Sequence, residues 1–142
     1  MIDILRLRKV SLSMLFVAFF LWLHFWARFW VVYLSYSGIL CNPVGPFGII
    51  LPEWFIVGVS FVIVGGIFLM VSKNLNLSFQ WPWLLILSGG LGNLSERIFF
   101  GCITDYVHFL FFPVFNVADV LLTLGAAVLL WRLRPVEKND LL

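Results

Sequence analysis

Residues 54–71 read WFIVGVSFVIVGGIFLMV and contain no charged side chain. A membrane-spanning helix needs about 20 predominantly apolar residues, so this segment is long and apolar enough to be one. The whole chain has 142 residues, of which 63% are hydrophobic and 11% are charged. A soluble domain of this size carries about 25% charged residues. We therefore predict an integral membrane protein with a single domain over residues 1–142.

Three further segments are apolar enough to be membrane helices. The predicted fold class is all-α, with four transmembrane helices at about 11–35, 54–71, 81–100 and 116–133. The third segment opens with Trp81-Pro82-Trp83, and proline suits the first turn of a helix. Its middle reads Ser88-Gly89-Gly90-Leu91-Gly92, and the small residues in this stretch would let another helix, or a substrate backbone, approach closely. The first segment is longer than the apolar region of a signal peptide, which has about 7–15 residues, so we expect a retained helix.

The lysines and arginines in the tails, in the loops and at the helix ends are distributed asymmetrically. They lie in the two tails and in the middle loop, at Arg6, Arg8, Lys9, Lys73, Arg132, Arg134 and Lys138. The other loops, 36–53 and 101–115, contain no Lys or Arg and are unusually apolar. Cytoplasmic loops of membrane proteins are enriched in Lys and Arg, so both termini are predicted to be cytoplasmic. The two apolar loops would then pack at the membrane interface on the outer face.

Several other classes of function are not indicated by the composition. The net charge of +2 gives no sign of nucleic-acid binding. Cys41 and Cys102 form no CxxC pair, and His24 and His108 lie in different segments, so no metal site is predicted. No cofactor is predicted either. The two cysteines are expected to stay unpaired, with Cys102 as a small apolar side chain.

A group of polar residues cannot be explained by hydropathy. Within one helix, residues three or four positions apart share a face. The group consists of His24 and Arg28 in the first helix, Asn93, Glu96 and Arg97 in the third, Asn116 and Asp119 in the fourth, and Asp105 in the last loop. An ionisable residue at membrane depth costs about 2.5–3.5 kcal/mol on insertion scales and is read as functional. Because these residues fall toward the outer ends of their segments, they predict one site near the outer leaflet.

Most of these residues also have a purely structural interpretation. Asn116 is a typical N-cap for the fourth helix. Arg28 could extend toward the lipid headgroups, and Glu96 could lie at the membrane interface. Arg97 could be a counter-ion that holds carboxylates in place. Asp119 is the hardest to explain in this way, because it lies one turn inside an apolar helix.

Asp105 and Asp119 are the candidate catalytic residues. If the loop 101–115 folds back at Pro113, Asp105 returns to the start of the fourth helix. Two carboxyls that lie close together cannot both ionise easily, so one holds a proton while the other is a carboxylate. Such a pair can activate water as a base and protonate a substrate as an acid. This is the chemistry of an aspartic peptidase, which needs no metal and forms no covalent intermediate.

Three motifs carry a resemblance to a known family. They are GNLSER at Gly92–Arg97, GCITDY at Gly101–Tyr106 and FNVAD at Phe115–Asp119. In this order and spacing they resemble the GNxxDR, GxVxDF and FNxAD motifs of the lipoprotein signal peptidases, or signal peptidase II. The resemblance implies that Asp105 and Asp119 form a catalytic dyad. It also implies that Asn93, Arg97 and Asn116 support the dyad and the substrate.

The resemblance is weaker in two other regions. Asn42, with Gly45, Phe47 and Gly48, is only loosely similar to the outer-loop motif of the family, NxGxxF. In the first helix the family usually has DQxxK, where this chain has His24-Phe25-Trp26-Ala27-Arg28. Arg28 keeps the positive charge but the acidic residue is absent, and Glu96 replaces the motif aspartate. Because both aspartates of the dyad are present, the resemblance implies an active but divergent enzyme, whose substrate range or activity could be altered by these departures.

The resemblance implies a membrane aspartyl endopeptidase that removes signal peptides from prolipoproteins, cleaving before the diacylglyceryl-modified cysteine. Its partners would be the prolipoprotein and membrane lipids, and the protein would act as a monomer. It would lie in the bacterial inner membrane with its active site toward the outer face. Two alternatives remain open. One is a binding protein that has kept the scaffold and lost turnover, and the other is a small ion or proton carrier that uses Asp119.

Overall fold

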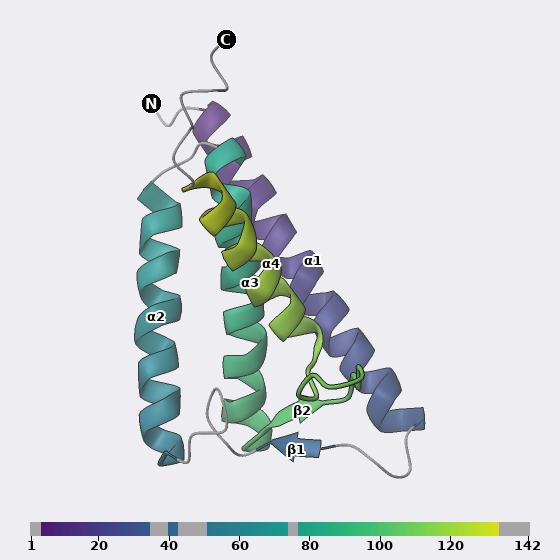
Figure 1. Ribbon diagram of the computed structural model, residues 1–142. Coiled ribbons are helices and arrows are strands. Elements are labelled where there is room, and N and C mark those ends of the chain that lie inside the picture. The colour runs from purple at the N-terminus through teal and green to yellow at the C-terminus, as the bar shows by residue number, and fades with distance from the viewer. Residues whose placement is uncertain (1–3, 35–39, 43–50, 74–76, 134–142) are drawn as a thin grey trace.

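The computed structural model describes residues 4–34, 40–42, 51–73 and 77–133. Within these ranges the chain forms four helices and two short strands (Figure 1). The elements are α1 (Ile4–Leu34), β1 (Leu40–Asn42), α2 (Glu53–Lys73), α3 (Leu77–Phe100), β2 (Ile103–Asp105) and α4 (Val117–Arg132). The prediction of a mostly helical fold with four helices is therefore confirmed. The predicted outer-loop residues Gly45, Phe47 and Gly48 lie outside the described residues, as do Arg134 and Lys138.

Two helices begin earlier than the apolar pattern predicts. α1 begins at Ile4 and not near residue 11, because basic residues such as Arg8 and Lys9 are good helix formers. α3 begins at Leu77, so the prediction that Pro82 lies in the first turn is wrong. Pro82 lies inside the helix, where it lacks the N–H that would bond one turn back. Hydropathy marks where a helix becomes apolar, and a helix can begin outside that stretch.

Helix α4 begins where Asn116 caps it, as predicted. The side-chain oxygen of Asn116 accepts a hydrogen bond from the Asp119 backbone N–H, at 3.1 Å. In return, the Asp119 carboxylate accepts a hydrogen bond from the Asn116 backbone N–H, at 3.2 Å. This reciprocal pair is a capping box, which satisfies two backbone donors at the start of the helix. The cap therefore fixes Asp119 in the first turn of α4.

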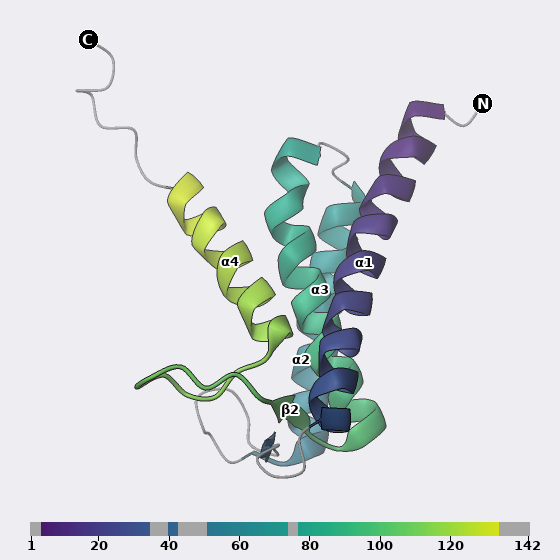
Figure 2. The same cartoon turned by 90° about the vertical axis from the view of Figure 1, so that its right-hand side faces the viewer.

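Helix α3 is the centre of the bundle and packs against the other three helices. Its most extensive contact is with α4, and Figure 2 shows that α4 diverges from α3 toward its C-terminal end. Gly89 makes the close approach possible, because a Cβ atom there would collide with the backbone oxygen of Ala118 and lie 2.9 Å from Leu122 Cγ. The predicted role of the small residues in α3 is therefore confirmed for Gly89.

Gly89→Ala is expected to lower the free energy of unfolding by about 1–3 kcal/mol, because the added methyl group overpacks the α3–α4 contact. The obstacle is the backbone of Ala118, which cannot rotate away as a side chain can. Gly65→Ala in α2 is the matched control, since nothing lies within 4 Å of its Cβ position. The control should be neutral or stabilising by up to about 1 kcal/mol. Equal effects of the two substitutions on unfolding in detergent would contradict the packing role of Gly89.

The two strands form a small antiparallel sheet at one end of the bundle (Figure 1). Leu40 pairs with Asp105, Cys41 with Thr104, and Asn42 with Ile103. Next to this pairing, Cys41 and Cys102 form a disulfide bond. The prediction that the cysteines stay unpaired is therefore wrong. Cysteine spacing cannot indicate a bridge across a separation of 61 residues, because only strand pairing brings the two side chains together.

The loop between β2 and α4 folds back, as predicted, but not at Pro113. The backbone pairs at Val107 and Phe115, whose N–H···O contacts are 2.8 and 3.1 Å. The turn lies at residues 109–112, where the Phe112 N–H donates to the Phe109 oxygen at 2.9 Å. Leu110 has a φ of 44° there, a conformation that is uncommon outside glycine. The resulting arm projects from the bundle in Figure 2 and returns the chain to the start of α4.

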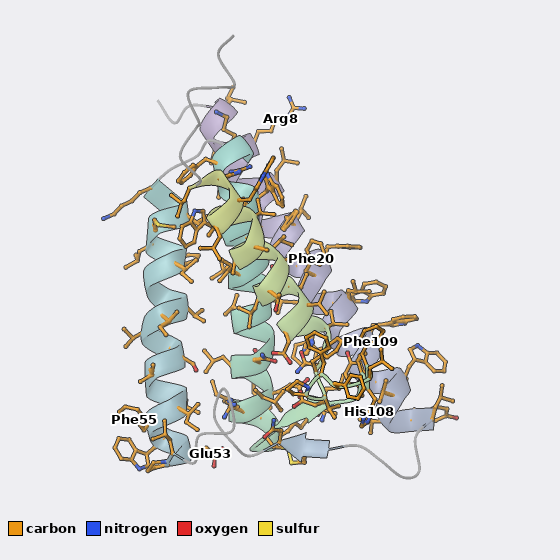
Figure 3. The ribbon with its side chains drawn as sticks, viewed as in Figure 1. Arg8, Phe20, Glu53, Phe55, His108 and Phe109 are labelled. Atoms are coloured by element: carbon orange, nitrogen blue, oxygen red, sulfur yellow. A yellow bond between two sulfur atoms is a disulfide. The ribbon has the colours of Figure 1, made fainter. Side chains whose placement is uncertain are left out.

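Large apolar side chains cover the outside of α1 and α2. Two described helical segments, Leu7–Leu34 and Glu53–Lys73, are long and apolar enough to cross a membrane. Charged residues lie near the ends of these segments, with Arg8 at one end of the bundle and Glu53 at the other (Figure 3). Helix α4 has 16 residues and a length of about 24 Å, at 1.5 Å per residue. Because large apolar side chains are exposed along α1 and α2, the outer surface of the bundle is better suited to lipid than to water.

Candidate active site

Asp105 occupies the last position of strand β2 and is almost fully buried, with 4% of its surface exposed. Each carboxylate oxygen accepts a hydrogen bond from an amide. The Asn42 side chain donates to Oδ2 at 2.9 Å, and the Asn116 side chain donates to Oδ1 at 3.0 Å. Asn42 reaches Asp105 because their strands are paired, which makes the two residues diagonal neighbours across the sheet.

Asp119 lies in the first turn of α4 and is partly exposed. Its Oδ1 atom accepts a hydrogen bond from the Asn93 side chain at 2.8 Å. Its Oδ2 atom accepts the capping bond from the Asn116 backbone described above. α3 therefore holds one carboxylate oxygen of Asp119, and the cap of α4 holds the other.

Two asparagines connect the two carboxyl groups. The Asn116 side-chain nitrogen donates to Asp105 and also to the Asn93 side-chain oxygen, at 3.1 Å. Asn93 in turn donates to Asp119. A continuous chain of hydrogen bonds thus runs from Asp105 through Asn116 and Asn93 to Asp119. Asn116 is fully buried, so its amide cannot exchange these partners for water.

The surroundings of this pair disfavour the ionised form of Asp105. Burial raises the pKa of the Asp105 carboxyl above its usual range, and the negative charge of Asp119 acts in the same direction. The hydrogen bonds from Asn42 and Asn116 oppose this rise. Arg97, which is buried in α3, interacts electrostatically with both carboxylates and with Glu53. Its positive charge offsets part of the negative charge of the pair.

Arg28 and Glu96, which were also predicted to belong to the site, meet at Thr104, the neighbour of Asp105. Arg28 Nε donates to Thr104 Oγ1 at 3.1 Å, and Glu96 Oε2 accepts from the Thr104 backbone N–H at 2.6 Å. His24 contacts Glu96 from α1. These residues form a second cluster beside the aspartate pair.

Sequence reasoning did not single out Thr104 or Tyr106 as part of the site. The Tyr106 hydroxyl accepts a hydrogen bond from the Val117 backbone N–H, at 3.4 Å, and so covers the start of α4. Burial raises the pKa of this hydroxyl, which keeps it protonated. Both residues flank Asp105 in the motif GCITDY, and that position was the available signal. Within the described part of the chain, no three His, Cys, Asp or Glu side chains are grouped so that they could hold a metal ion.

The fold and the site define a class of helical proteins in which two aspartates are joined through amides beside a short sheet. The family model described as signal peptidase (SPase) II matches residues 24–134, which is most of the chain and includes every residue of the site. The chain belongs to the signal peptidase II family.

Curated relatives are similar over the same region. The lipoprotein signal peptidase of Streptococcus pyogenes serotype M6 is 38% identical over 87 residues, which are 56% of this chain and 57% of the relative. The lipoprotein signal peptidase of Streptococcus agalactiae serotype V is 37% identical over 94 residues, 61% of this chain and 59% of the relative. The matched region thus spans somewhat more than half the length of these relatives.

Two solved structures share the fold. Both are described as bacterial membrane enzymes studied by the in meso method, at 2.3 and 1.9 Å resolution. The first has a TM-score of 0.79 and 22% identity, and the match covers 87% of this chain and 88% of that one. The second has a TM-score of 0.79 and 21% identity, and covers 89% and 96%. At this level of identity the likeness concerns the fold alone.

Proposed function

We propose that this protein is a membrane aspartyl endopeptidase that removes signal peptides from lipid-modified prolipoproteins, cleaving before the diacylglyceryl-cysteine. The observation that carries the proposal is the hydrogen-bonded chain that joins Asp105 to Asp119. Membership of the signal peptidase II family and the names of the curated relatives support the choice of substrate.

The two carboxyls take different roles in the proposed reaction. Asp105, whose pKa is raised by burial, holds the proton and donates it to the oxygen of the scissile carbonyl. Asp119, which is partly exposed, accepts a proton from the water whose oxygen attacks the carbonyl carbon. In the second step the C–N bond breaks, and the proton on Asp119 passes to the leaving amine. Asp105 regains its proton from the collapsing tetrahedral intermediate, so the dyad ends as it began.

The charges and the disulfide support an orientation in the membrane. The basic residues Arg8, Lys9, Lys73 and Arg132 lie at helix ends on one side of the bundle, and the β1–β2 sheet lies at the opposite end (Figure 1). The positive-inside rule assigns the basic end to the cytoplasm. Disulfides persist in oxidising compartments, and the Cys41–Cys102 bond lies at the sheet. We therefore place both termini in the cytoplasm and the active site toward the outer face of the bacterial inner membrane.

The proposed substrate would approach from the lipid phase. Its apolar signal helix would lie beside the bundle, and its diacylglyceryl chains would stay in the outer leaflet near the apolar arm at residues 109–112. Phe111 is almost fully exposed there, at 99%, and its neighbours are apolar.

A single chain carries both carboxyls, so the protein is proposed to act as a monomer, with residues 1–142 as one membrane domain.

Cleavage of a purified substrate is the direct test. The protein in detergent is incubated with a diacylglyceryl-modified prolipoprotein, and the product is detected by its shift on a gel. Cleavage of the modified form, but not of the unmodified form, is the expected result. Binding of the modified form without any cleavage would instead support the alternative of a binding protein on the same scaffold.

Asn42→Leu is expected to move the alkaline limb of the pH–activity profile to higher pH. The Asn42 amide stabilises the ionised form of Asp105, so its removal raises the pKa of Asp105 further. The protonated, active form of Asp105 then persists to higher pH. The measurement is the cleavage rate as a function of pH, with the exposed Ser72→Ala as the control. A limb that stays in place, or moves to lower pH, would contradict the assignment of the proton to Asp105.

A further inference from the structure

A buried polar cluster next to the aspartate pair joins α1, α3 and β2. His24 and Glu96 are both fully buried, and His24 Nε2 lies 2.9 Å from Glu96 Oε1. The His24 ring reaches this position by packing on Gly92, where a Cβ atom would lie 3.2 Å from the ring. Two of the residues that depart from the family motifs, His24 and Glu96, are therefore in contact with each other.

The second oxygen of Glu96 holds strand β2. Glu96 Oε2 accepts the Thr104 backbone N–H at 2.6 Å, which is a short hydrogen bond to a charged acceptor. Arg28 Nε donates to the Thr104 hydroxyl and lies 3.6 Å from Glu96 Oε2. Its guanidinium also lies over the Phe100 ring, 3.7 Å from the centroid. Thr104 is thus held at its backbone and at its side chain.

Strand β2 depends on these contacts because it is short. It has three residues and pairs with β1, which also has three. So short a pair is only marginally stable without support from packing or side chains. Thr104 directly precedes Asp105, so any displacement of Thr104 also moves the Asp105 carboxyl. A displacement of about 1 Å at a reacting group can cost about 10²-fold in rate.

We infer that His24 and Glu96 are positioning residues, which hold strand β2 through Thr104 and thereby place Asp105 for catalysis. The inference rests on the proposed peptidase reaction and deepens it. Neither side chain touches the substrate or the reacting atoms in this role. The role belongs to the pair, because His24 acts on Thr104 only through Glu96.

Three single variants and one double variant test this role by kinetics. His24→Phe keeps a ring but loses the polar contact, and Glu96→Ala removes the acceptor for the Thr104 N–H. Each is expected to lower kcat by about 10–100-fold with KM nearly unchanged, because Asp105 is displaced while the substrate surface is intact. His24→Gln, whose amide nitrogen can occupy the position of Nε2, should recover most of the activity. In the Glu96→Ala background, His24→Phe should cause little further loss.

Ser13→Ala is the matched control, because it breaks another buried contact between α1 and α3, from Ser13 Oγ to Gln80 Oε1 at 3.2 Å. Ser13 precedes His24 by about 16 Å along α1, at 1.5 Å per residue. This control is expected to lower thermal stability without lowering kcat of the folded protein. If it lowered kcat as much as His24→Phe, or if His24→Gln gave no rescue, the positioning role would be wrong.

Amide hydrogen exchange tests the same inference independently of activity. In His24→Phe and Glu96→Ala the peptide that covers residues 103–106 should exchange about tenfold faster or more, because the bond to Thr104 N–H is weakened or lost. The exchange of this peptide should be unchanged in Ser13→Ala. Unchanged exchange of this peptide in both His24→Phe and Glu96→Ala would overturn the inference. An inactive wild type with the expected exchange pattern would overturn the proposed function and leave the placement of β2 by Glu96 established.

Discussion

Asp119→Asn is expected to abolish cleavage of a diacylglyceryl-modified prolipoprotein while the protein remains folded. The carboxylate is the proposed base for the attacking water, and an amide cannot accept that proton. General acid–base catalysis contributes about 10²–10⁴-fold in rate, so the residual activity should be at or near the background. The amide oxygen of asparagine can still accept a hydrogen bond from the Asn116 backbone, which preserves the cap of α4.

Asp105→Asn is expected to cause a loss of the same size for a different reason. The amide cannot deliver a proton to the carbonyl oxygen. Substrate binding, measured with the same modified prolipoprotein, should persist in both variants. Substantial cleavage by either variant would contradict the dyad, because a single remaining carboxyl cannot supply both an acid and a base. The melting temperature in detergent distinguishes a loss of catalysis from a loss of the fold. In both variants it should stay close to that of the wild type.

The helical part of the fold could be predicted because it depends on local pattern. Apolar segments of sufficient length identify helices, and Asn116 marks the start of α4 by its capping chemistry. The position of Asp119 in the first turn followed directly. The beginning of α3 could not be predicted in this way, because Leu77 and the residues after it are not distinguished by hydropathy.

The sheet and the turn of the arm could not be predicted from local pattern. Strands β1 and β2 have three residues each, too few for an alternating pattern to be recognised. Their pairing, and the Cys41–Cys102 bond with it, joins parts of the chain on either side of α2 and α3. The turn at Leu110 has a positive φ, and the sequence FLFF at residues 109–112 contains no Gly, Asn or Asp that would predict it. The role of Asn42 beside Asp105 could be suspected only from the family resemblance, since it depends on this pairing.

Asn116 illustrates why the structural and functional interpretations of one residue need not compete. Its side-chain oxygen caps α4, and its side-chain nitrogen joins Asp105 to Asn93. An amide is suited to both tasks, because it carries an acceptor and two donors. The same residue therefore starts the helix that carries one carboxyl and holds the other carboxyl in place.

Breaking the Cys41–Cys102 disulfide is expected to reduce both stability and activity. A bond across a sequence separation of 61 residues stabilises by about 4 kcal/mol in the chain-entropy model, and by less if the denatured state keeps its helices. The bond also fixes β1 against β2, and Asn42 follows Cys41 directly in β1. Without the bond, the hydrogen bond from Asn42 to Asp105 is less well maintained, so the cleavage rate should fall.

The experiment compares the wild type with the Cys41→Ser, Cys102→Ser double variant, each with and without a reductant. Cys41 is exposed at the surface, so a soluble reductant can reach the bond. The wild type should lose stability and cleavage rate on reduction and then match the double variant, which should not respond to the reductant. If the reduced wild type kept its stability and rate, β1 would be held by its backbone pairing alone. The bond would then have no part in placing Asn42 beside Asp105, and the pairing of the three-residue strands would have to be sufficient by itself.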